Sequence, residues 1–515
     1  MKKFLSILAL IVTLDGYSQI SFNKLESYGN PAISATNIER IGDNYFVQYL
    51  FIDSSHIQGV GVLKTDKYGN VIKKIEFKDT AFWYGSFSFS NFIATSDSFL
   101  IMAANRFYNQ QLKKEEVEIW KFDINLDTVW TKLINHPDTA QANLPGAETL
   151  MRVKDIVEAL DGGYVLSISY NRQCLDPSVF SNRRALLIKL DTSGSSVWIN
   201  RNSEYYKDLI SLDITSDSGF IVPTIRGNTG LPYNLNKFDK NGNYQWKVDA
   251  NAYSTQTHAI ACCEYDSASA IMATYYKIDI QSGKYGITVF KINTITKSVE
   301  WNKDFIVSED MASQINLSNS PMEIRVKSGK VFIATSGRHL YFTPPPWVYS
   351  YHIYSGIVLK LNSHGDSLKT YYLNYDKNGG CDMELEGFMV LDDGSFAGTG
   401  YGLSYANHRQ MLWLFRTTAT GYLNIENQKA VNGFKLSVFP NPATGKLNFT
   451  FDKNIQSRIV LTIYNSIGQK IGNYTITGGQ TGFNINIHDY KSGIYFYRFT
   501  DKNNIQIAFG KFIRE

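Results

Sequence analysis

A short phrase of apolar and polar residues recurs along most of the chain. It contains two or three apolar residues, a basic residue, an apolar residue, an Asp or Asn, a turn and often a Trp, and residues 187–198 show it most completely. The basic residue falls at seven positions, which are Lys64, Lys121, Lys189, Lys237, Lys291, Lys360 and Arg416. The gaps between them run from 48 to 69 residues. That irregular period is typical of a four-stranded unit with loops of variable length.

A second phrase, a small polar turn followed by an apolar strand, precedes each copy of the first. Residues 161–166 and 217–222 are examples, with Asp-Gly-Gly and Asp-Ser-Gly at their turns. Tight hairpins favour such residues because Gly adopts positive φ without strain. Two phrases per unit predict about four strands. Units of this kind bury both faces only when they are stacked in a ring.

We therefore predict an all-β protein with a seven-bladed β-propeller over residues 19–425, followed by a small C-terminal β-sandwich. In each blade the near-continuous apolar run would be buried between neighbouring blades. The Asp or Asn would cap a turn, and the Trp would fill the gap between adjacent blades. Residues 20–23 resemble an outer strand without the rest of its blade, and we expect them to close the ring.

The first phrase resembles the repeats of the tryptophan-docked propellers, a group that includes the quinoproteins. Asp191, Gly194 and Trp198 match that pattern best, and the Trp is absent from the first, sixth and seventh units. The resemblance implies the architecture and says little about chemistry.

Composition and charge narrow the class of protein. The chain has 515 residues, of which 43% are hydrophobic, 19% charged and 14% aromatic, and its formal net charge is +4. These values are typical of a folded globular protein and not of a disordered one. A weak charge without a Lys/Arg cluster gives no reason to expect nucleic acid or an anionic membrane as a partner.

The N-terminus reads as a signal peptide over residues 1–18. Lys2 and Lys3 precede an apolar run from Phe4 to Leu14, and small residues follow it. The run is too short to span a bilayer, and no other stretch approaches the length of a spanning helix. We expect an exported protein that does not span the membrane.

Composition changes near the C-terminus. Residues 426–434 are polar and predict a linker, and residues 435–515 alternate between apolar and polar positions as in a small antiparallel sandwich. They resemble the type A C-terminal sorting domain of the type IX secretion system. The resemblance rests on short elements that contain Phe439, Pro440, Asn441, Pro442, Gly468, Gly493, Tyr495 and Lys511. It implies the secretion machinery and a sorting peptidase as partners, and a secreted or cell-surface location.

No catalytic residue, metal site or cofactor site can be assigned from the sequence. The segments that begin at Asp123 and Asp239 alternate oxygen-bearing side chains as a calcium loop does, but both lack its bidentate Glu and fall where the repeat needs a turn. We therefore predict no cofactor, with calcium as the alternative. The eight His residues are scattered, and none has metal-ligand spacing backed by a carboxylate.

Four cysteines leave the disulfide pairing open. They are Cys174, Cys262, Cys263 and Cys381. A bond between adjacent residues closes almost no loop and would stabilise little, so we expect free or incidentally paired thiols. Quinoproteins sometimes form a vicinal disulfide, which makes a quinoprotein-like dehydrogenase a third hypothesis. Two observations argue against a quinoprotein. The repeat predicts seven blades where those dehydrogenases have eight, and the calcium and quinone ligands cannot be placed.

Two aromatic segments are the candidate binding residues. The first contains Phe82, Trp83 and Tyr84, and the second contains Tyr341, Phe342, Trp347, Tyr349 and Tyr351. Exposed rings give a large contact area at low entropic cost, so we read both as loops on a rim that binds glycan or protein. The alternative for the two loops is that their rings are buried within the loops themselves. The alternatives for the function of the protein are an extracellular hydrolase or lyase with acids on the propeller face, and a purely structural surface protein.

Overall fold

The structure is a computed structural model, and it confirms the all-β prediction. It describes residues 21–85, 91–108, 115–134, 151–171, 183–200, 208–209, 211–225, 233–250, 260–277, 285–308, 322–342, 350–374, 381–404, 409–418, 423, 436–451, 458–465, 469–501 and 506–515. These residues form strands β1 to β37 and no helix, so none of them forms a helix long and apolar enough to cross a membrane. The chain divides into two compact units, Met1–Asn424 and Ile425–Glu515. The predicted signal peptide and linker lie outside the described residues.

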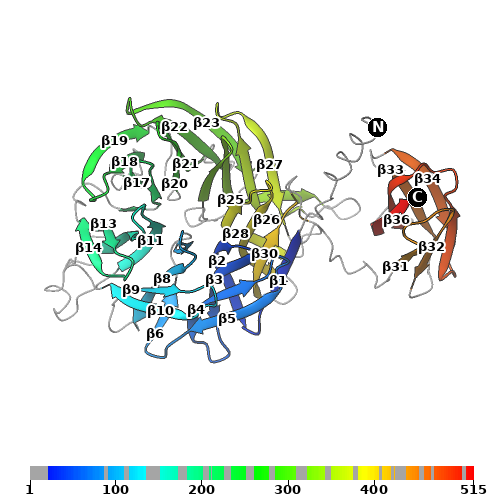
Figure 1. The fold of residues 1–515 in the computed structure, drawn as a ribbon, viewed down its shortest axis with the longest axis horizontal. Coiled ribbons are helices and arrows are strands. Elements are labelled where there is room, and N and C mark those ends of the chain that lie inside the picture. Colours follow the sequence, from blue (N-terminus) through cyan, green and yellow to red (C-terminus); the bar gives the residue numbers. More distant parts are fainter. Residues whose placement is uncertain are drawn as a thin grey trace, which may run out of the picture. The chain divides into compact units, whose positions relative to one another are not determined.

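In the described part of the first unit the strands form seven sheets, one per repeat, around a common centre (Figure 1). The first four blades contain β2 (Ala32–Ile41), β3 (Asn44–Ile52), β4 (Gln58–Thr65) and β5 (Val71–Phe77); β6 (Phe82–Gly85), β7 (Phe92–Ala94), β8 (Leu100–Tyr108), β9 (Glu115–Phe122) and β10 (Thr128–Ile134); β11 (Met151–Glu158), β12 (Tyr164–Asn171), β13 (Arg183–Leu190) and β14 (Ser196–Asn200); and β15 (Asp208–Leu209), β16 (Asp213–Ile214), β17 (Phe220–Ile225), β18 (Tyr233–Phe238) and β19 (Tyr244–Ala250). The last three contain β20 (Ile260–Asp266), β21 (Ser269–Lys277), β22 (Tyr285–Asn293) and β23 (Ser298–Ser308); β24 (Met322–Lys327), β25 (Lys330–Phe342), β26 (Ser350–Leu361) and β27 (Ser367–Leu373); and β28 (Cys381–Val390), β29 (Phe396–Ser404), β30 (Gln410–Arg416) and β1 (Phe22–Glu26). The predicted propeller is confirmed.

The ring closes where the sequence predicted. Strand β1 pairs antiparallel with β30 and forms the outer strand of the seventh blade, with Phe22 opposite Arg416. Because this blade takes strands from both ends of the propeller segment, backbone hydrogen bonds join the first described residues to the last blade.

Tryptophan side chains fill the contacts between neighbouring blades. The Trp198 ring of β14 lies against Gly242, and the Trp301 ring of β23 lies against Gly365, each in a turn of the next blade. An added Cβ at Gly242 would stand 2.7 Å from Cζ3 of Trp198. Phe22 lies against Gly69 in the same way, so a phenylalanine performs the Trp role at the closure. The predicted role of the Trp is thus seen in the structure.

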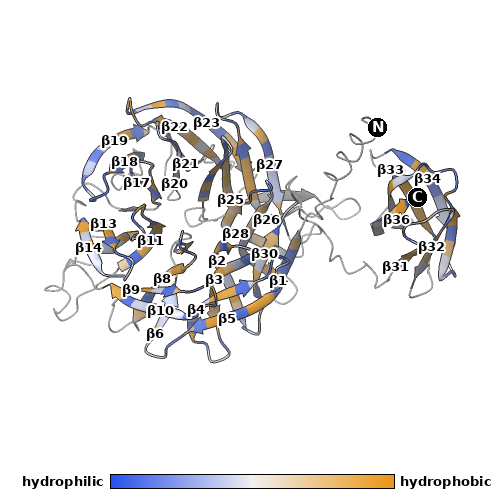
Figure 2. Cartoon of the chain, in the orientation of Figure 1, coloured by the Kyte–Doolittle hydropathy of each residue, from blue (hydrophilic) through white to orange (hydrophobic). Residues whose placement is uncertain are grey.

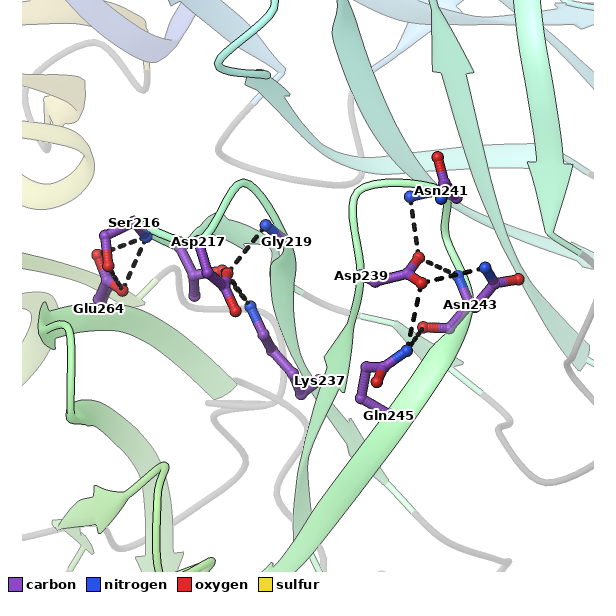
Figure 3. Close-up of polar contacts among 10 residues, drawn as sticks. Ser216, Asp217, Gly219, Lys237, Asp239, Asn241, Asn243, Gln245 and Glu264 are labelled. Carbon is purple, nitrogen blue, oxygen red and sulfur yellow. Dashed lines mark hydrogen bonds and ion pairs between the residues drawn. The ribbon is translucent and has the colours of Figure 1, made fainter.

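The two repeated phrases are joined by an ion pair inside the blade. Lys189 of β13 pairs with Asp161, and Lys237 of β18 pairs with Asp217 at 2.5 Å, as Figure 3 shows for the second pair. Both lysines are buried, with 5% and 6% of their surface exposed. A buried ammonium needs such a partner, which explains why a basic residue can occupy an otherwise apolar strand.

Hydrophobic side chains fill the space between blades. The buried cluster around Ile101 and Leu186, for example, combines residues of the second and third blades. The outer strands β5 and β23 alternate between hydrophobic and hydrophilic residues along their length (Figure 2), because only one face of an outer strand is covered. Third strands with near-continuous apolar runs and outer strands that alternate are what a radial stack of sheets requires.

The second unit contains two sheets. One is formed by β31 (Leu436–Phe439), β32 (Lys446–Phe451) and β35 (Gly482–Asn486), and the other by β33 (Ile459–Asn465), β34 (Lys470–Ile476), β36 (Gly493–Asp501) and β37 (Gln506–Arg514). Leu447 and Phe449 of the first sheet share a buried cluster with Leu461 and Phe499 of the second.

Distant elements of the sorting motif meet in this unit. The Oδ1 atom of Asn441 accepts a hydrogen bond from the Ile513 N–H at 2.9 Å, close to Lys511 in the last strand. The Tyr495 hydroxyl donates to the Lys491 carbonyl at 2.8 Å, and its ring stacks on Phe512. The motif residues therefore help to hold the fold of the unit together. Gly468 lies outside the described residues.

Candidate functional site

The innermost strands place one residue of each blade at the same level around the axis. The residue is found by following the strand pairing inward from the basic residue of the repeat. In the sixth blade, for example, Lys360 of the third strand is opposite Phe332 of the second strand, and Phe332 is opposite Arg325 of the innermost strand. The same two pairings identify one residue in every blade. We call this set the first ring, and it consists of Glu39, Ile93, Val157, Asp213, Cys263, Arg325 and Met389.

A second ring lies two residues earlier in the chain, within the innermost strand or directly before it. Its members are Asn37, Asn91, Asp155, Ser211, Ala261, Glu323 and Gly387. The residues between the two rings are apolar or Cys and buried, and they are Ile38, Phe92, Ile156, Leu212, Cys262, Ile324 and Phe388. Successive side chains of a strand point to opposite sides. Polar groups thus recur at two levels along the inner strands, with a buried layer between them.

A cavity of about 330 Å³ is lined by residues of both rings. The lining includes the acidic residues Glu39, Asp155, Asp213, Glu264 and Glu323 and the basic residue Arg325. These residues come from β2, β11, β16, β20 and β24, so five blades contribute ionisable residues to what we call the axial cavity.

Arg325 is the cationic centre of the cavity. Its Nη2 atom lies 2.8 Å from Oε2 of Glu323, and 42% of its side-chain surface is exposed while Glu323 is buried. Glu39 and Asp213 also interact electrostatically with the guanidinium. One positive charge therefore faces several carboxyl groups.

Burial changes the acidity of these carboxyl groups. It raises the pKa of Glu39 to about 8, that of Glu323 to about 7 and that of Asp213 to about 6, and the nearby Arg325 acts in the opposite direction. Burial also raises the pKa of Asp155. Clustered groups with such shifts are typical of ligand and catalytic sites, although structural networks show them as well.

Some of the polar groups join neighbouring blades. The two carboxylate oxygens of Asp155 accept hydrogen bonds from the N–H groups of Ile156 and, in the next blade, Leu212. Glu264 accepts hydrogen bonds from the N–H and hydroxyl of Ser216 in the preceding blade (Figure 3). Asp213 accepts one from the Glu264 N–H at 2.7 Å. Backbone N–H groups of the next blade also interact with Glu39 and Glu323, namely those of Ala94 and Phe388. Arg325, whose side chain is 42% exposed, is the charged group best placed to contact a ligand.

The first aromatic segment is a strand and not the expected loop. Phe82, Trp83 and Tyr84 belong to β6, which pairs with β8. Tyr84 is 5% exposed and donates a hydrogen bond to Glu118, and the Phe82 ring packs on Tyr84. Trp83 is 39% exposed and stacks on Phe107. Only Trp83 of the three offers a large exposed ring.

Only part of the second aromatic segment is described. Tyr341 and Phe342 are on β25 and Tyr351 is on β26, where Tyr341 is opposite Tyr351. Trp347 and Tyr349 lie outside the described residues. This segment too is partly strand where the sequence suggested a loop.

The adjacent cysteines are free and buried. Both residues belong to the lining of the axial cavity, and burial raises the pKa of each thiol above its usual range. No vicinal disulfide is formed, so the feature that suggested a quinoprotein is missing. Cys174 lies outside the described residues, as does the side chain of Cys381.

The two calcium-like segments form ordinary turns. Asp239 accepts hydrogen bonds from the N–H groups of Asn241 and Asn243 (Figure 3), and Asp123 accepts the equivalent pair from Asn125 and Asp127. In the described part of the chain, no three His, Cys, Asp or Glu side chains are grouped so that they could hold one metal ion.

None of the cavity residues was predicted from the sequence. Their residue types differ from blade to blade, so they carry no repeat signal. A signal was nevertheless present. Following the expected strand pairing from the basic residue of each repeat to the second strand, and from there to the innermost strand, would have placed Glu39, Asp213 and Arg325 at equivalent positions of their blades.

Comparison with known proteins identifies the C-terminal unit. A family described as "Secretion system C-terminal sorting domain" matches residues 437–514. The protein is thus exported by the type IX secretion system and is secreted or located at the cell surface. No curated protein matches the chain significantly.

Among solved structures, similar chains are propeller proteins of low identity. The β-propeller domain of the trilobed protease of Pyrococcus furiosus is 10% identical with a TM-score of 0.40, covering 76% of this chain and 99% of that chain. The acylaminoacyl peptidase of Pyrococcus horikoshii is 11% identical with a TM-score of 0.40, covering 82% and 59%. The Hadza microbial sialidase Hz136 is 9% identical with a TM-score of 0.39, covering 70% and 73%. Such low values say nothing about activity.

Proposed function

We propose that this exported propeller is a binding protein that takes a small polar ligand, such as part of a glycan, into its axial cavity. The supporting observation is that Arg325 and acidic residues of four other blades line one cavity of about 330 Å³. Small-molecule sites in proteins begin at about that size, with a few convergent polar groups that orient the ligand.

The sorting domain supports the rest of the proposal. We propose that the surface peptidase removes the C-terminal unit after export, and that the propeller then acts outside the cell as a glycan-binding or surface-protein-binding module. Its side chains suit polar ligands, because carboxylates accept hydrogen bonds from hydroxyl groups while the Arg325 guanidinium donates them.

An extracellular hydrolase or lyase is the second candidate. Its support is the contrast between Glu39, with a pKa of about 8, and Asp213, with a pKa of about 6. At neutral pH the first is mostly protonated and the second mostly ionised. Pairs of carboxyl groups with separated pKa values can serve as general acid and as base or nucleophile.

Thermal-shift screening of the full chain against small saccharides, amino sugars and amines tests the proposal. We expect a member of the panel to raise the melting temperature of the wild type and of Trp83→Ala, and to leave that of Glu39→Gln unchanged. Loss of the response in Trp83→Ala alone would move the site to the aromatic rim. Turnover of a compound in the panel would favour the enzyme.

A further inference from the structure

The lining of the axial cavity holds more acidic than basic groups. Four carboxyl groups, those of Glu39, Asp155, Asp213 and Glu323, interact electrostatically with the single guanidinium of Arg325. In their ionised forms these groups repel an anionic ligand and attract a cation.

The buried carboxylate of Glu323 lacks well-formed hydrogen bonds. Glu323 is 4% exposed, its Oε2 atom lies 2.8 Å from Nη2 of Arg325, and the Phe388 N–H of the next blade interacts with the carboxylate. Neither oxygen accepts a hydrogen bond of good geometry. Leaving a buried acceptor unpaired costs about 1–3 kcal/mol. A donor brought by a ligand would remove that cost.

The arrangement of the carboxyl groups determines what kind of cation fits. No three of the described acidic, His or Cys side chains are close enough to share a metal ion. Glu39 and Asp213 belong to the first ring, and Asp155 and Glu323 to the second. Two residues along a strand separate the levels by roughly 6.6 Å, at about 3.3 Å per residue.

We infer that the axial cavity binds an organic cation with two amino groups, one at the level of Glu39 and Asp213 and the other at the level of Glu323. This inference rests on the proposed function and specifies the ligand class for the same cavity. Ammonium groups donate three hydrogen bonds each, so one of them supplies the donor that Glu323 Oε1 lacks. The short chain between the amino groups lies along the apolar part of the lining, which includes Ile93 and Val157 of the first ring and Ala261 of the second.

Binding of a dication must be linked to protons. The ionisable residues of the lining are Glu39 on β2, Asp155 on β11, Asp213 on β16, Cys263 and Glu264 on β20 and Glu323 and Arg325 on β24, with Glu386 on β28 beside Glu323. Burial raises the pKa values of Glu39, Glu323 and Asp213 to about 8, 7 and 6. A bound cation lowers them again, so these carboxyl groups release protons on binding.

Titration calorimetry of the full chain with 1,4-diaminobutane tests the inference, with 1,4-butanediol as the neutral probe of equal chain length. We expect the diamine to bind and the diol not to bind. The diamine affinity should rise by about tenfold between pH values of about 6 and 8, and its apparent enthalpy should differ between two buffers in the manner of proton release.

Charge-removing variants locate the site. Glu39→Gln and Glu323→Gln should each weaken diamine binding by about tenfold, while Asp127→Asn, which removes an exposed carboxylate on a distant turn, should leave it unchanged. If Glu323→Gln fails to fold, Glu39→Gln alone decides. Equal weakening by all three variants would indicate a diffuse electrostatic effect and overturn the inference.

The two proposals fail in different ways. Equal binding of the diol and the diamine would overturn the cation inference and leave an axial ligand site in place. Absence of diamine binding, together with a Glu39-dependent response to a neutral saccharide in the screen, would do the same. No response to any compound would overturn both.

Discussion

Replacement of Gly242 by Ala tests how the blades are held together. Gly242 has a φ of +78°, and an added Cβ would stand 2.7 Å from Cζ3 of Trp198 and 2.8 Å from its Cη2. The Ala variant therefore has two costs. A left-handed backbone costs a non-glycine residue about 1–2 kcal/mol, and overpacking against the indole costs about 1–3 kcal/mol more.

Gly162→Ala separates the two costs. Gly162 has a φ of +81°, but its added Cβ would meet only Cγ2 of Thr192, at an ordinary 3.5 Å. We expect Gly162→Ala to lower the free energy of unfolding by about 1 kcal/mol and Gly242→Ala to lower it by about 3 kcal/mol. In a Trp198→Ala background the cost of Gly242→Ala should fall to that of Gly162→Ala, because the clashing ring is gone.

Urea unfolding followed by tryptophan fluorescence measures these differences. All eight tryptophans precede residue 425, so the signal reports the propeller and not the C-terminal unit. If Gly242→Ala were no more harmful than Gly162→Ala, or equally harmful with and without Trp198, the Trp–Gly contact would not join the blades.

Three further results are expected. Asp161→Ala should lower the urea midpoint more than Lys189→Met does. Asp161→Ala leaves the buried Lys189 ammonium without its partner, whereas Lys189→Met leaves a carboxylate that is 63% exposed to water. Equal midpoints for the two variants would contradict this. The melting temperature should fall as pH rises from about 5 to about 8. The reason is that Glu39, with a folded pKa of about 8, binds its proton more tightly in the folded protein than in the unfolded chain, where the pKa is about 4.3. Glu39→Gln should flatten this profile, and an unchanged slope would refute the raised pKa of Glu39. Tyr495→Ala should reduce the amount of protein exported, because it removes the hydrogen bond to the Lys491 carbonyl and the stacking on Phe512. Immunoblots of the medium and the cell surface measure the exported amount. Normal export would show that the C-terminal unit is recognised without this packing.

The sequence predicted the architecture because the same physical requirement recurs in every blade. Each third strand must be apolar and each turn must be capped, so the phrase around Lys189 reappears, and its Trp lies where a gap between blades must be filled. The outer strand that closes the ring was visible because Phe22 lies in a strand-like segment without a blade of its own. Repetition turned a weak local signal into a prediction of the whole ring.

The axial cavity was not predictable in this way. Its charged residues Glu39, Asp213 and Arg325 occupy equivalent positions in three blades, but no two of these blades use the same residue there. A site built from single residues of several blades depends on ring closure, which places them around one axis. Phe82, Trp83 and Tyr84 form a strand instead of the expected loop for a related reason, because aromatic residues such as Tyr84 are as useful in a core as on a surface.

The most direct test of the proposed site is a crystal structure of the full chain soaked with the compound of the screen that stabilises it most. We expect electron density for that compound in the axial cavity, within hydrogen-bonding distance of Glu39, Glu323 or Arg325. Density on Trp83, or an unoccupied cavity in crystals of a chain that binds the compound in solution, would show that the propeller binds its ligand elsewhere.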